Sequence, residues 1–205
     1  MTDTQADAAG STQAIQTVLA DPKDFNAVHP LNTAWTLWFD NQNKKSSVLN
    51  WTDNLKEVVT MNTVEDYWGV YNNVALASDL PSGSNYHLFR KGIVPMWEDA
   101  ANAKGGKWGH QFQRSIGEKV NEHWLHILLA CIGEAFESSP DVCGVVFSNR
   151  KSCFRIAIWT RNASDEEACR NIGRYFKNIL GLKQSVDYMS HKDATKSNPQ
   201  ALYTV

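Results

Sequence analysis

Apolar and polar residues alternate along several short stretches of the chain, which is the pattern typical of β-strands. In "HPLNTAWTLWFD" the large apolar residues Trp35, Leu37 and Phe39 are separated by single residues, and Trp38 adds an apolar group on the other face. This stretch predicts a strand that is apolar on both faces. Further strands are predicted near Tyr86 to Phe89, after Gly105–Gly106, on both sides of a polar tip at Asn149 to Ser152, and near Gln184 to Met189.

Two stretches before the tip carry the signals of helices. "NTVEDYWGVYNNV" begins with Thr63 as a capping residue and places Glu65 and Asp66 in the first turn, where acidic side chains favour a helix. A longer helix is predicted from about Glu118 to Glu137, because apolar residues recur there at helical spacing. Those residues are Val120, Trp124, Ile127, Leu128 and Cys131.

"SDEEACRNIGRYFKNILG" predicts a third helix, with Ser164 and Glu167 as a capping box and Gly181 as its stop. Strands that interleave with about three helices, and that are joined as hairpins, predict an α+β domain with one curved antiparallel sheet and the helices packed on one face. Residues 1–28 are rich in Ala, Thr, Asp and Gln, so we expect a mobile N-terminal tail. The folded domain would then span residues 29–205.

The composition is that of an ordinary globular chain except for its tryptophans. The 205 residues include 42% hydrophobic and 20% charged residues, but also 8 tryptophans, more than a core of this size needs. A formal net charge of -2 argues against broad, non-specific nucleic-acid binding, which needs a basic surface. The 4 cysteines show no CxxC pair or metal spacing, and neither a long apolar run nor a secretory signal is visible. We expect a cytoplasmic or nuclear protein.

Tryptophans in loop-like contexts are candidates for binding, because an exposed indole can stack on a nucleobase. Trp51 in "LNWTDNL" and Trp97 in "GIVPMWED" are such positions, although tryptophan more often simply packs in a core. Glu98 could accept both the N1–H and N2–H donors of a guanine, or could instead lie in the first turn of a helical "EDAANAK". Asp99 is assigned no more than a local cap or a surface acid.

Basic residues gather at two of the predicted turns. Arg150 and Lys151 lie on the hairpin tip, Arg155 lies beyond it, and Lys104 and Lys107 flank the Gly-Gly turn. A charged tip is ordinarily solvated surface or protection of a sheet edge. Taken with the tryptophans and the glutamate, it points to a guanine nucleotide with a phosphate tail. The chain has no GxxxxGK[ST] motif, which argues against a conventional GTPase.

Several short motifs together resemble the eukaryotic translation initiation factor 4E family, which binds the mRNA cap. They occur in the family's order from His29 onward, so the resemblance covers nearly all of the chain except the tail. The motifs are "HPLNTAWTLWF", "TVEDYW", "GIVPMWED", "GGKW", "WLHILLACIGE" and "RIAIWT".

The resemblance implies a cupped sheet with helices on its convex back and the cap in its concave mouth. Trp51 and Trp97 would sandwich 7-methylguanine, whose positive charge adds cation–π attraction to the stacking. Glu98 would accept from the base's N1 and N2 donors, the Trp97 backbone N–H would meet O6, and Trp159 would line the methyl group. The residues implied to meet the phosphates are Arg150 and Arg155, with Lys107 and Lys196 as weaker candidates.

The resemblance also implies a partner site on the opposite, dorsal face. It would receive a helix carrying Tyr-x-x-x-x-Leu-hydrophobic, from the scaffold factor 4G or from inhibitory binding proteins. The residues implied are His29, Pro30, Val64, Trp68, Leu125, Ile132 and Glu134. Taken alone, Val64, Leu125 and Ile132 read as ordinary helix core, whereas Trp68 is the stronger candidate because indoles dominate interface energetics. We expect a monomer with no membrane segment, cofactor or metal.

The chain departs from the family pattern at several positions. Ser152 stands where a second lysine is frequent on the hairpin, and His126 stands where a glutamate is common. The "ATKSNPQ" loop has no clear match for the serine phosphorylated in animal members. Repressor variants tend to replace the tryptophans equivalent to Trp35 and Trp51; both are present, which favours a form that promotes translation over the alternative of a cap-binding repressor.

An enzyme that hydrolyses nucleotides is the alternative from another class. It needs a carboxylate cluster for a metal, or a nucleophile with a base. "DEE" at Asp165 to Glu167 is better explained as a helix start, and His123 and His126 lack the glutamate of an HExxH site. A tryptophan-rich peptide-binding module would not explain Glu98 and the basic tip together. The sequence therefore predicts a cap-binding protein that recruits a scaffold factor and is not an enzyme.

Overall fold

The structure is a computed structural model, which describes residues 27–41, 54–196 and 200–205. Of the predicted tail, residues 1–26 lie outside the described residues. Trp51 also lies outside them. The strands are β1 (Pro30–Asn41), β2 (Lys56–Thr63), β3 (Ser84–Arg90), β4 (Gly106–Gln113), β5 (Val142–Asn149), β6 (Cys153–Thr160), β7 (Asp187–Ser190) and β8 (Tyr203–Thr204). The α-helices are α1 (Val64–Tyr71), α2 (Lys119–Ile132) and α3 (Glu166–Ile179).

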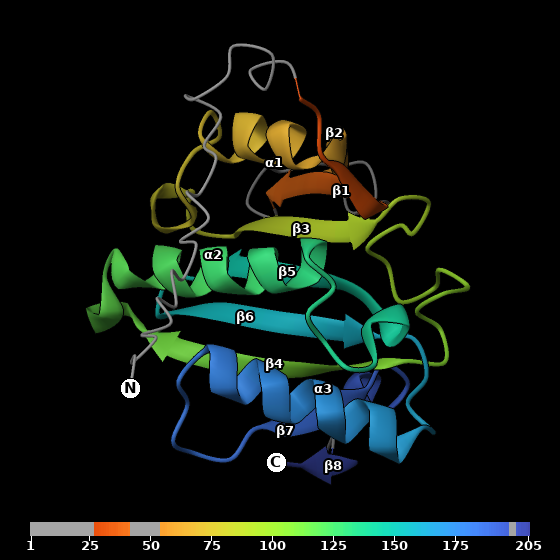
Figure 1. Cartoon of the computed structure of the whole chain (residues 1–205). Coiled ribbons are helices and arrows are strands. Elements are labelled where there is room, and N and C mark those ends of the chain that lie inside the picture. The colour runs from red at the N-terminus through yellow and green to blue at the C-terminus, as the bar shows by residue number, and fades with distance from the viewer. Residues whose placement is uncertain (1–26, 42–53, 197–199) are drawn as a thin grey trace, which may run out of the picture.

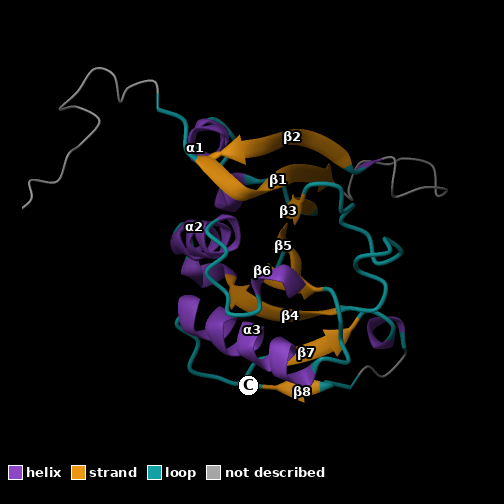
Figure 2. Ribbon diagram, turned by 45° about the vertical axis from the view of Figure 1, so that its right-hand side comes forward, coloured by secondary structure: helices purple, strands orange, loops and turns teal. Residues whose placement is uncertain are grey.

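The strands form one curved 8-stranded antiparallel sheet in the order β2-β1-β3-β5-β6-β4-β7-β8. The three α-helices lie along one face of this sheet (Figure 1), and in the turned view loops occupy the other side (Figure 2). The predicted α+β fold with one curved sheet and helices on a single face is confirmed.

The main hydrophobic core lies between the helices and the sheet. Every second side chain of β6 points into it, because neighbouring residues of a strand face opposite sides. Phe154, Ile156 and Ile158 are all buried there, which leaves Arg155, Ala157 and Trp159 on the helix-free face. The largest fully buried side chains include Trp35, Trp108, Tyr188, Phe89, Phe147 and Phe176.

The helix α1 begins as its sequence predicts. The Thr63 side chain accepts a hydrogen bond from the Asp66 backbone N–H at 3.0 Å, and the Asp66 carboxylate accepts one from the Thr63 N–H at 3.2 Å. The start of α3 differs from the expectation, because Asp165 rather than Ser164 caps it. The Asp165 carboxylate accepts from the Ala168 N–H at 3.0 Å, while the Ser164 N–H donates to Asn162 Oδ1. Gly181 ends the helix with a φ of +61°, as predicted.

The helix α2 ends at Ile132, earlier than the predicted Glu137. The Ala135 N–H donates to the Ala130 carbonyl, and the Glu134 N–H donates to the Cys131 carbonyl. This is the Schellman arrangement, which needs a left-handed residue after the helix. Glu134 takes that conformation with a φ of 49°, although glycine stands next to it at position 133.

Strand β2 is absent from the sequence-based assignment. It pairs with β1, with Met61 opposite Trp35 and Val59 opposite Leu37. Its outer positions include Val58, which is 49% exposed, so it lacks a clean alternation of apolar and polar residues. The two-residue strand β8 is likewise too short to show any period.

Candidate functional site

Trp159 and two cationic side chains share the helix-free face of the sheet. Trp159 in β6 pairs with Lys107 in β4, and Arg155 pairs with Gln111 in β4 and Ser148 in β5. Directly paired residues of neighbouring strands point to the same side. The strand register therefore places Trp159, Arg155 and Lys107 on one face, as the proposed base and phosphate contacts require.

The Trp159 ring contacts two other aromatic rings. Phe89 meets it edge-on, with 5.5 Å between ring centroids, and His191 lies on it at 4.2 Å. Gly144 makes room for this packing, because a Cβ there would lie 2.4 Å from Phe89 Cγ. The tryptophan is half-buried, so part of its surface faces outward on a rigid support.

Trp97 and Glu98 lie on the connection between β3 and β4, and both are exposed; 46% of the Trp97 surface is accessible. The next residue, Asp99, accepts hydrogen bonds from the backbone N–H groups of Val94 at 3.0 Å and Ala101 at 2.8 Å. This shows what Asp99 does: its carboxylate closes the turn that carries the tryptophan. The sequence "EDAANAK" forms turns rather than a helix.

A buried asparagine fixes the same connection from inside. Asn102 is 0% exposed, and its amide donates to the carbonyls of Val94 at 2.9 Å and Met96 at 2.7 Å. Two apolar residues of the connection, Ile93 and Ala101, pack on a small cluster that also includes Phe89 and Trp159. The connection with Trp97 and Glu98 is therefore anchored on the sheet beside Trp159.

Arg155 lies close enough to two other cations, Lys107 and Arg150, to influence each of them electrostatically. Burial lowers the pKa of Lys107, and the charge of Arg155 lowers it further. Burial also lowers the pKa of Arg150, again with a contribution from Arg155. Lys196, the weaker candidate, is exposed and forms an ion pair with Asp193. The structure thus groups Lys107, Arg150 and Arg155, whereas Lys196 is already paired.

The predicted partner residues lie around α1 and α2, which cover the same face of the sheet (Figure 1). Trp68 is 38% exposed and packs edge-on against Tyr67 and Tyr71. At the start of the same helix, the Val64 N–H donates to the His29 carbonyl at 2.9 Å, and the His29 ring bonds Glu65 at 2.6 Å.

The remaining partner candidates differ in how much of them is accessible. Pro30 is exposed, Leu125 is half-buried and Ile132 is only 6% exposed. Ile132 thus lies in the hydrophobic core, as its position in a helix pattern alone indicates.

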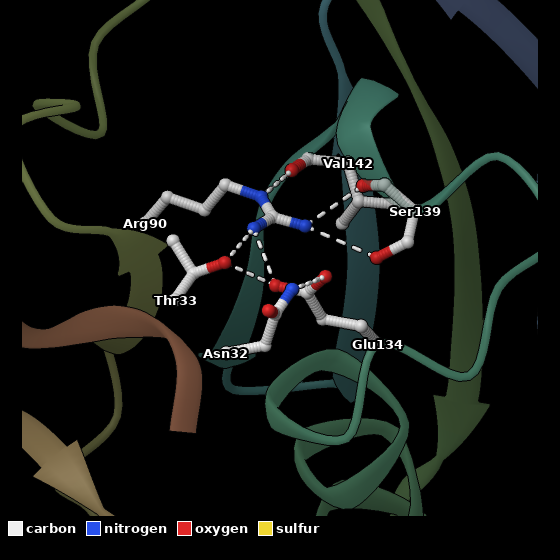
Figure 3. A network of polar contacts seen from close by, with 6 residues as sticks. All are labelled: Asn32, Thr33, Arg90, Glu134, Ser139 and Val142. Carbon is white, nitrogen blue, oxygen red and sulfur yellow. Dashed lines mark hydrogen bonds and ion pairs between the residues drawn. The ribbon is translucent and has the colours of Figure 1, made fainter. Parts of the chain in front are cut away.

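Glu134 belongs to a polar network that sequence reasoning missed (Figure 3). Its carboxylate accepts from Asn32 at 2.7 Å, from Thr33 and from Arg90 at 2.8 Å. The Arg90 guanidinium also donates to the Val142 and Ser139 carbonyls, at 2.8 and 2.9 Å. An arginine at the end of the apolar run "YHLFR" was the one sequence signal for a buried ion pair.

Neither a metal-binding cluster nor a helix that could span a membrane occurs in residues 27–41, 54–196 and 200–205. Within these ranges no group of three or more His, Cys, Asp or Glu side chains is arranged to hold a metal ion. Nor is any helix in this part long and apolar enough to cross a membrane. The four cysteines are buried and free.

Comparisons with known proteins agree on one family. The family model described as "Eukaryotic initiation factor 4E" matches residues 30–204. The eukaryotic translation initiation factor 4E of Dictyostelium discoideum is 41% identical over 83% of this chain and 67% of its own length. The factor 4E-1 of Triticum aestivum is 40% identical over 100% of this chain and 98% of its own.

Solved structures give the same result. The structure of C. elegans eIF4E-3 with the 4E-binding protein Mextli and a cap analog matches with a TM-score of 0.80 and 33% identity, over 87% of this chain and 100% of that one. The structure of Ascaris suum eIF4E-3 with an m7G cap matches with a TM-score of 0.81 and 34% identity, over 87% of this chain and 98% of that one.

Proposed function

The chain belongs to the eukaryotic initiation factor 4E family, and we propose that it binds the 7-methylguanosine cap of mRNA and recruits a scaffold factor to start translation. One observation carries this proposal. An exposed tryptophan with an adjacent carboxylate, Trp97–Glu98, is held rigidly on the face of the sheet that also presents Trp159 and the cations Lys107, Arg150 and Arg155. The function is binding, and no bond is made or broken.

The base is recognised by stacking and by its hydrogen-bonding edge. Trp97 supplies one face of the stack and Trp51 the other, and the positive charge of the methylated base adds cation–π attraction. Glu98 accepts from N1–H and N2–H of the guanine, the Trp97 N–H donates to O6, and Trp159 contacts the methyl group. Stacking contributes roughly 1–3 kcal/mol per base, and a hydrogen bond to a charged group roughly 1.5–3 kcal/mol. These terms suffice for micromolar or tighter binding after the cost of association.

The phosphates are met by the cation group. Arg150 and Arg155 can donate to phosphate oxygens in the bidentate manner of a guanidinium, and Lys107 adds a point charge. Lys196 would first have to leave Asp193, so its contribution is smaller. This local concentration of charge allows a nucleotide to bind although the net charge of the chain is -2.

The dorsal face receives the partner. We propose that a helix with Tyr-x-x-x-x-Leu-hydrophobic, from factor 4G or an inhibitory binding protein, packs on Trp68 and Leu125 and approaches His29, Pro30 and Val64. In support, C. elegans eIF4E-3, which is 33% identical to this chain, forms a complex with the 4E-binding protein Mextli. Because Trp68 is exposed on α1 while the cation group lies on the opposite face, both ligands can bind together in the cytoplasm.

Titration of intrinsic tryptophan fluorescence with 7-methyl-GTP tests the cap proposal, with unmethylated GTP as the matched control. We expect strong quenching by 7-methyl-GTP and far weaker binding of GTP, since only the methylated base carries a positive charge between the indoles. Equal affinity for the two nucleotides would refute the charge-dependent stacking.

A further inference from the structure

A carboxylate is buried on the helix-free face beside the cation group. Asp40 in β1 is only 3% exposed and lies opposite Asn85 of β3 in the strand register. The Asn85 amide donates to Asp40 Oδ1 at 2.8 Å and Oδ2 at 3.0 Å, and His87 Nε2 bonds Oδ1 at 2.7 Å. A buried charge is costly unless it is paired and hydrogen-bonded, so this arrangement must be compensated by its neighbours.

Asn85 links this carboxylate to Arg150. The Arg150 guanidinium donates to Asn85 Oδ1 at 2.9 Å, to the Asn149 carbonyl at 3.1 Å and to the Ser84 carbonyl at 3.4 Å. A guanidinium has five N–H donors. These three bonds to described residues leave two donors of Arg150 for a further acceptor, such as a phosphate oxygen.

The direction of the Asn85 amide follows from Asp40. An ionised carboxylate only accepts hydrogen bonds, so the amide nitrogen of Asn85 must face Asp40 and the amide oxygen must face the arginine. If Asp40 were absent, the amide could turn over and present its N–H groups to the guanidinium, which has only donors. Asp40 therefore determines whether Arg150 finds an acceptor at this point.

Charge gives a second link between the same residues. Burial and the nearby charge of Arg155 both lower the pKa of Arg150, whereas Asp40 acts in the opposite direction. Two cations held close together repel each other before any phosphate arrives. The buried carboxylate reduces this repulsion from the side of the sheet, so that Arg150 stays in place when the site is empty.

We propose that Asp40, acting through Asn85, is a positioning residue that presents Arg150 to the phosphate chain of the capped ligand. The proposal rests on the proposed cap-binding function and deepens it. Pre-ordering a long side chain removes part of the entropy cost of binding. Asp40 should thus strengthen binding of the phosphates while leaving the contacts with the base unchanged.

The test compares two ligands that share the base, 7-methylguanosine without phosphate and 7-methyl-GTP. The ratio used is the dissociation constant of 7-methylguanosine divided by that of 7-methyl-GTP, which measures how much the phosphates strengthen binding. In Asp40→Asn and Asn85→Ala we expect this ratio to fall about three- to tenfold, as for one side chain that must be ordered on binding. The dissociation constant of 7-methylguanosine should stay within about twofold of the original. Asp187→Asn makes the same charge change on the exposed start of β7 and should leave the ratio unchanged.

A double-mutant cycle separates positioning from a general structural effect. In the Arg150→Ala background, Asp40→Asn should no longer change the ratio, because the residue that it positions is gone. An unchanged ratio in folded Asp40→Asn and Asn85→Ala overturns the proposal, and so does an equal loss for both ligands. Should Asp40→Asn fail to fold, the proposal is tested by Asn85→Ala and by the double-mutant cycle of Asn85→Ala with Arg150→Ala, with the same outcomes expected. Failure of the original protein to prefer 7-methyl-GTP over GTP would instead refute the cap-binding function.

Discussion

Arg90 and Glu134 form an ion pair of 2.8 Å that joins the end of β3 to the turn after α2. Their side chains are only 10% and 16% exposed. The connection with Trp97 and Glu98 begins directly after Arg90, and Glu134 lies on the helical face of the molecule. One ion pair thus fixes the geometry of elements that serve both proposed sites. Burial raises the pKa of Glu134, but hydrogen bonds from Thr33, Arg90 and Asn32 outweigh this effect and leave the pKa lowered.

Replacing Glu134 with alanine should lower the free energy of unfolding by about 3 kcal/mol, because it leaves the Arg90 charge buried without its partner. Urea denaturation measures this change, and Glu137→Ala, at an exposed glutamate three residues on, should alter stability by less than about 0.5 kcal/mol. Glu134→Gly should cost about 1 kcal/mol less than Glu134→Ala, since glycine adopts the left-handed conformation without strain. Equal stability of the Glu134→Ala and original proteins would show that the pair contributes nothing.

Changing Glu98 to glutamine should weaken 7-methyl-GTP binding by about 30-fold or more, because the amide places a donor against the base's N–H groups and removes a charge-assisted bond. Calorimetric titration measures the loss. Glu118→Gln, at an exposed position before α2, makes the same chemical change away from the site and should bind normally. A loss of less than threefold in Glu98→Gln would remove this carboxylate from the base contacts.

Asn102→Ala tests whether the Trp97 connection is pre-ordered for binding. The substitution removes the bonds to the Val94 and Met96 carbonyls, so more of the connection must be ordered when the ligand arrives. We expect a roughly tenfold weaker 7-methyl-GTP affinity, together with faster hydrogen exchange of backbone amides at residues 94–101. Asn73→Ala removes a similar bond, from the Asn73 amide to the Gly69 carbonyl, and should change neither measurement. Weaker binding with unchanged exchange would contradict this explanation.

Trp68→Ala should separate the two faces of the molecule. Interface tryptophans commonly contribute about 2 kcal/mol or more, so we expect a loss of about 30-fold or more in affinity for a peptide containing Tyr-x-x-x-x-Leu-hydrophobic. Cap affinity should be unchanged, because Trp68 lies on α1 and the cation group lies on the other face of the sheet. Fluorescence anisotropy of a labelled peptide and 7-methyl-GTP titration of the same sample give both values. Loss of cap affinity in a folded variant would show that the two faces are not independent.

The sequence predicts the fold well where local signals agree. Alternation identified β1, and Thr63 with the acidic first turn identified α1, because capping and periodicity act over a few neighbouring residues. The predicted end of α2 at Glu137 is wrong, because the helix ends at Ile132. The left-handed residue that follows the helix is Glu134, while Gly133 keeps a right-handed helical conformation. The Glu134 side chain is held by Arg90 from a distant strand, and no local sequence pattern contains that contact.

The candidate site shows the same limit. Trp97, Glu98 and the basic residues could be selected by residue type and motif, because their chemistry suits a guanine nucleotide. The residues that support these side chains could not be selected in this way, because their roles come from strand pairing. Asp40 meets Asn85 only through the register of β1 and β3, and Asn85 reaches Arg150 across β5. For Asp99 the sequence left a local cap or a surface acid open, and the structure shows the local cap, because its carboxylate accepts from the backbone N–H groups of Val94 and Ala101.

Acidification should destabilise the protein through His191, which is 5% exposed and packs on Trp159. Burial, with a smaller contribution from the charge of Lys107, lowers the pKa of His191 to about 4. In the unfolded chain the pKa returns to about 6.5. Between these values the unfolded state binds a proton that the folded state does not, so stability is complete above about pH 6.5 and falls as the pH drops toward 4.

The expected slope from this one group is about 1.4 kcal/mol of unfolding free energy per pH unit within that window. Urea denaturation between pH 4.5 and 7 measures it, and His191→Gln should remove this share of the slope. His110 and His123 also have pKa values lowered by burial, so part of the slope should persist in His191→Gln. Adding His123→Gln to His191→Gln should decrease the slope further. An identical pH dependence in His191→Gln and the original protein would show that the buried imidazole does not control acid stability.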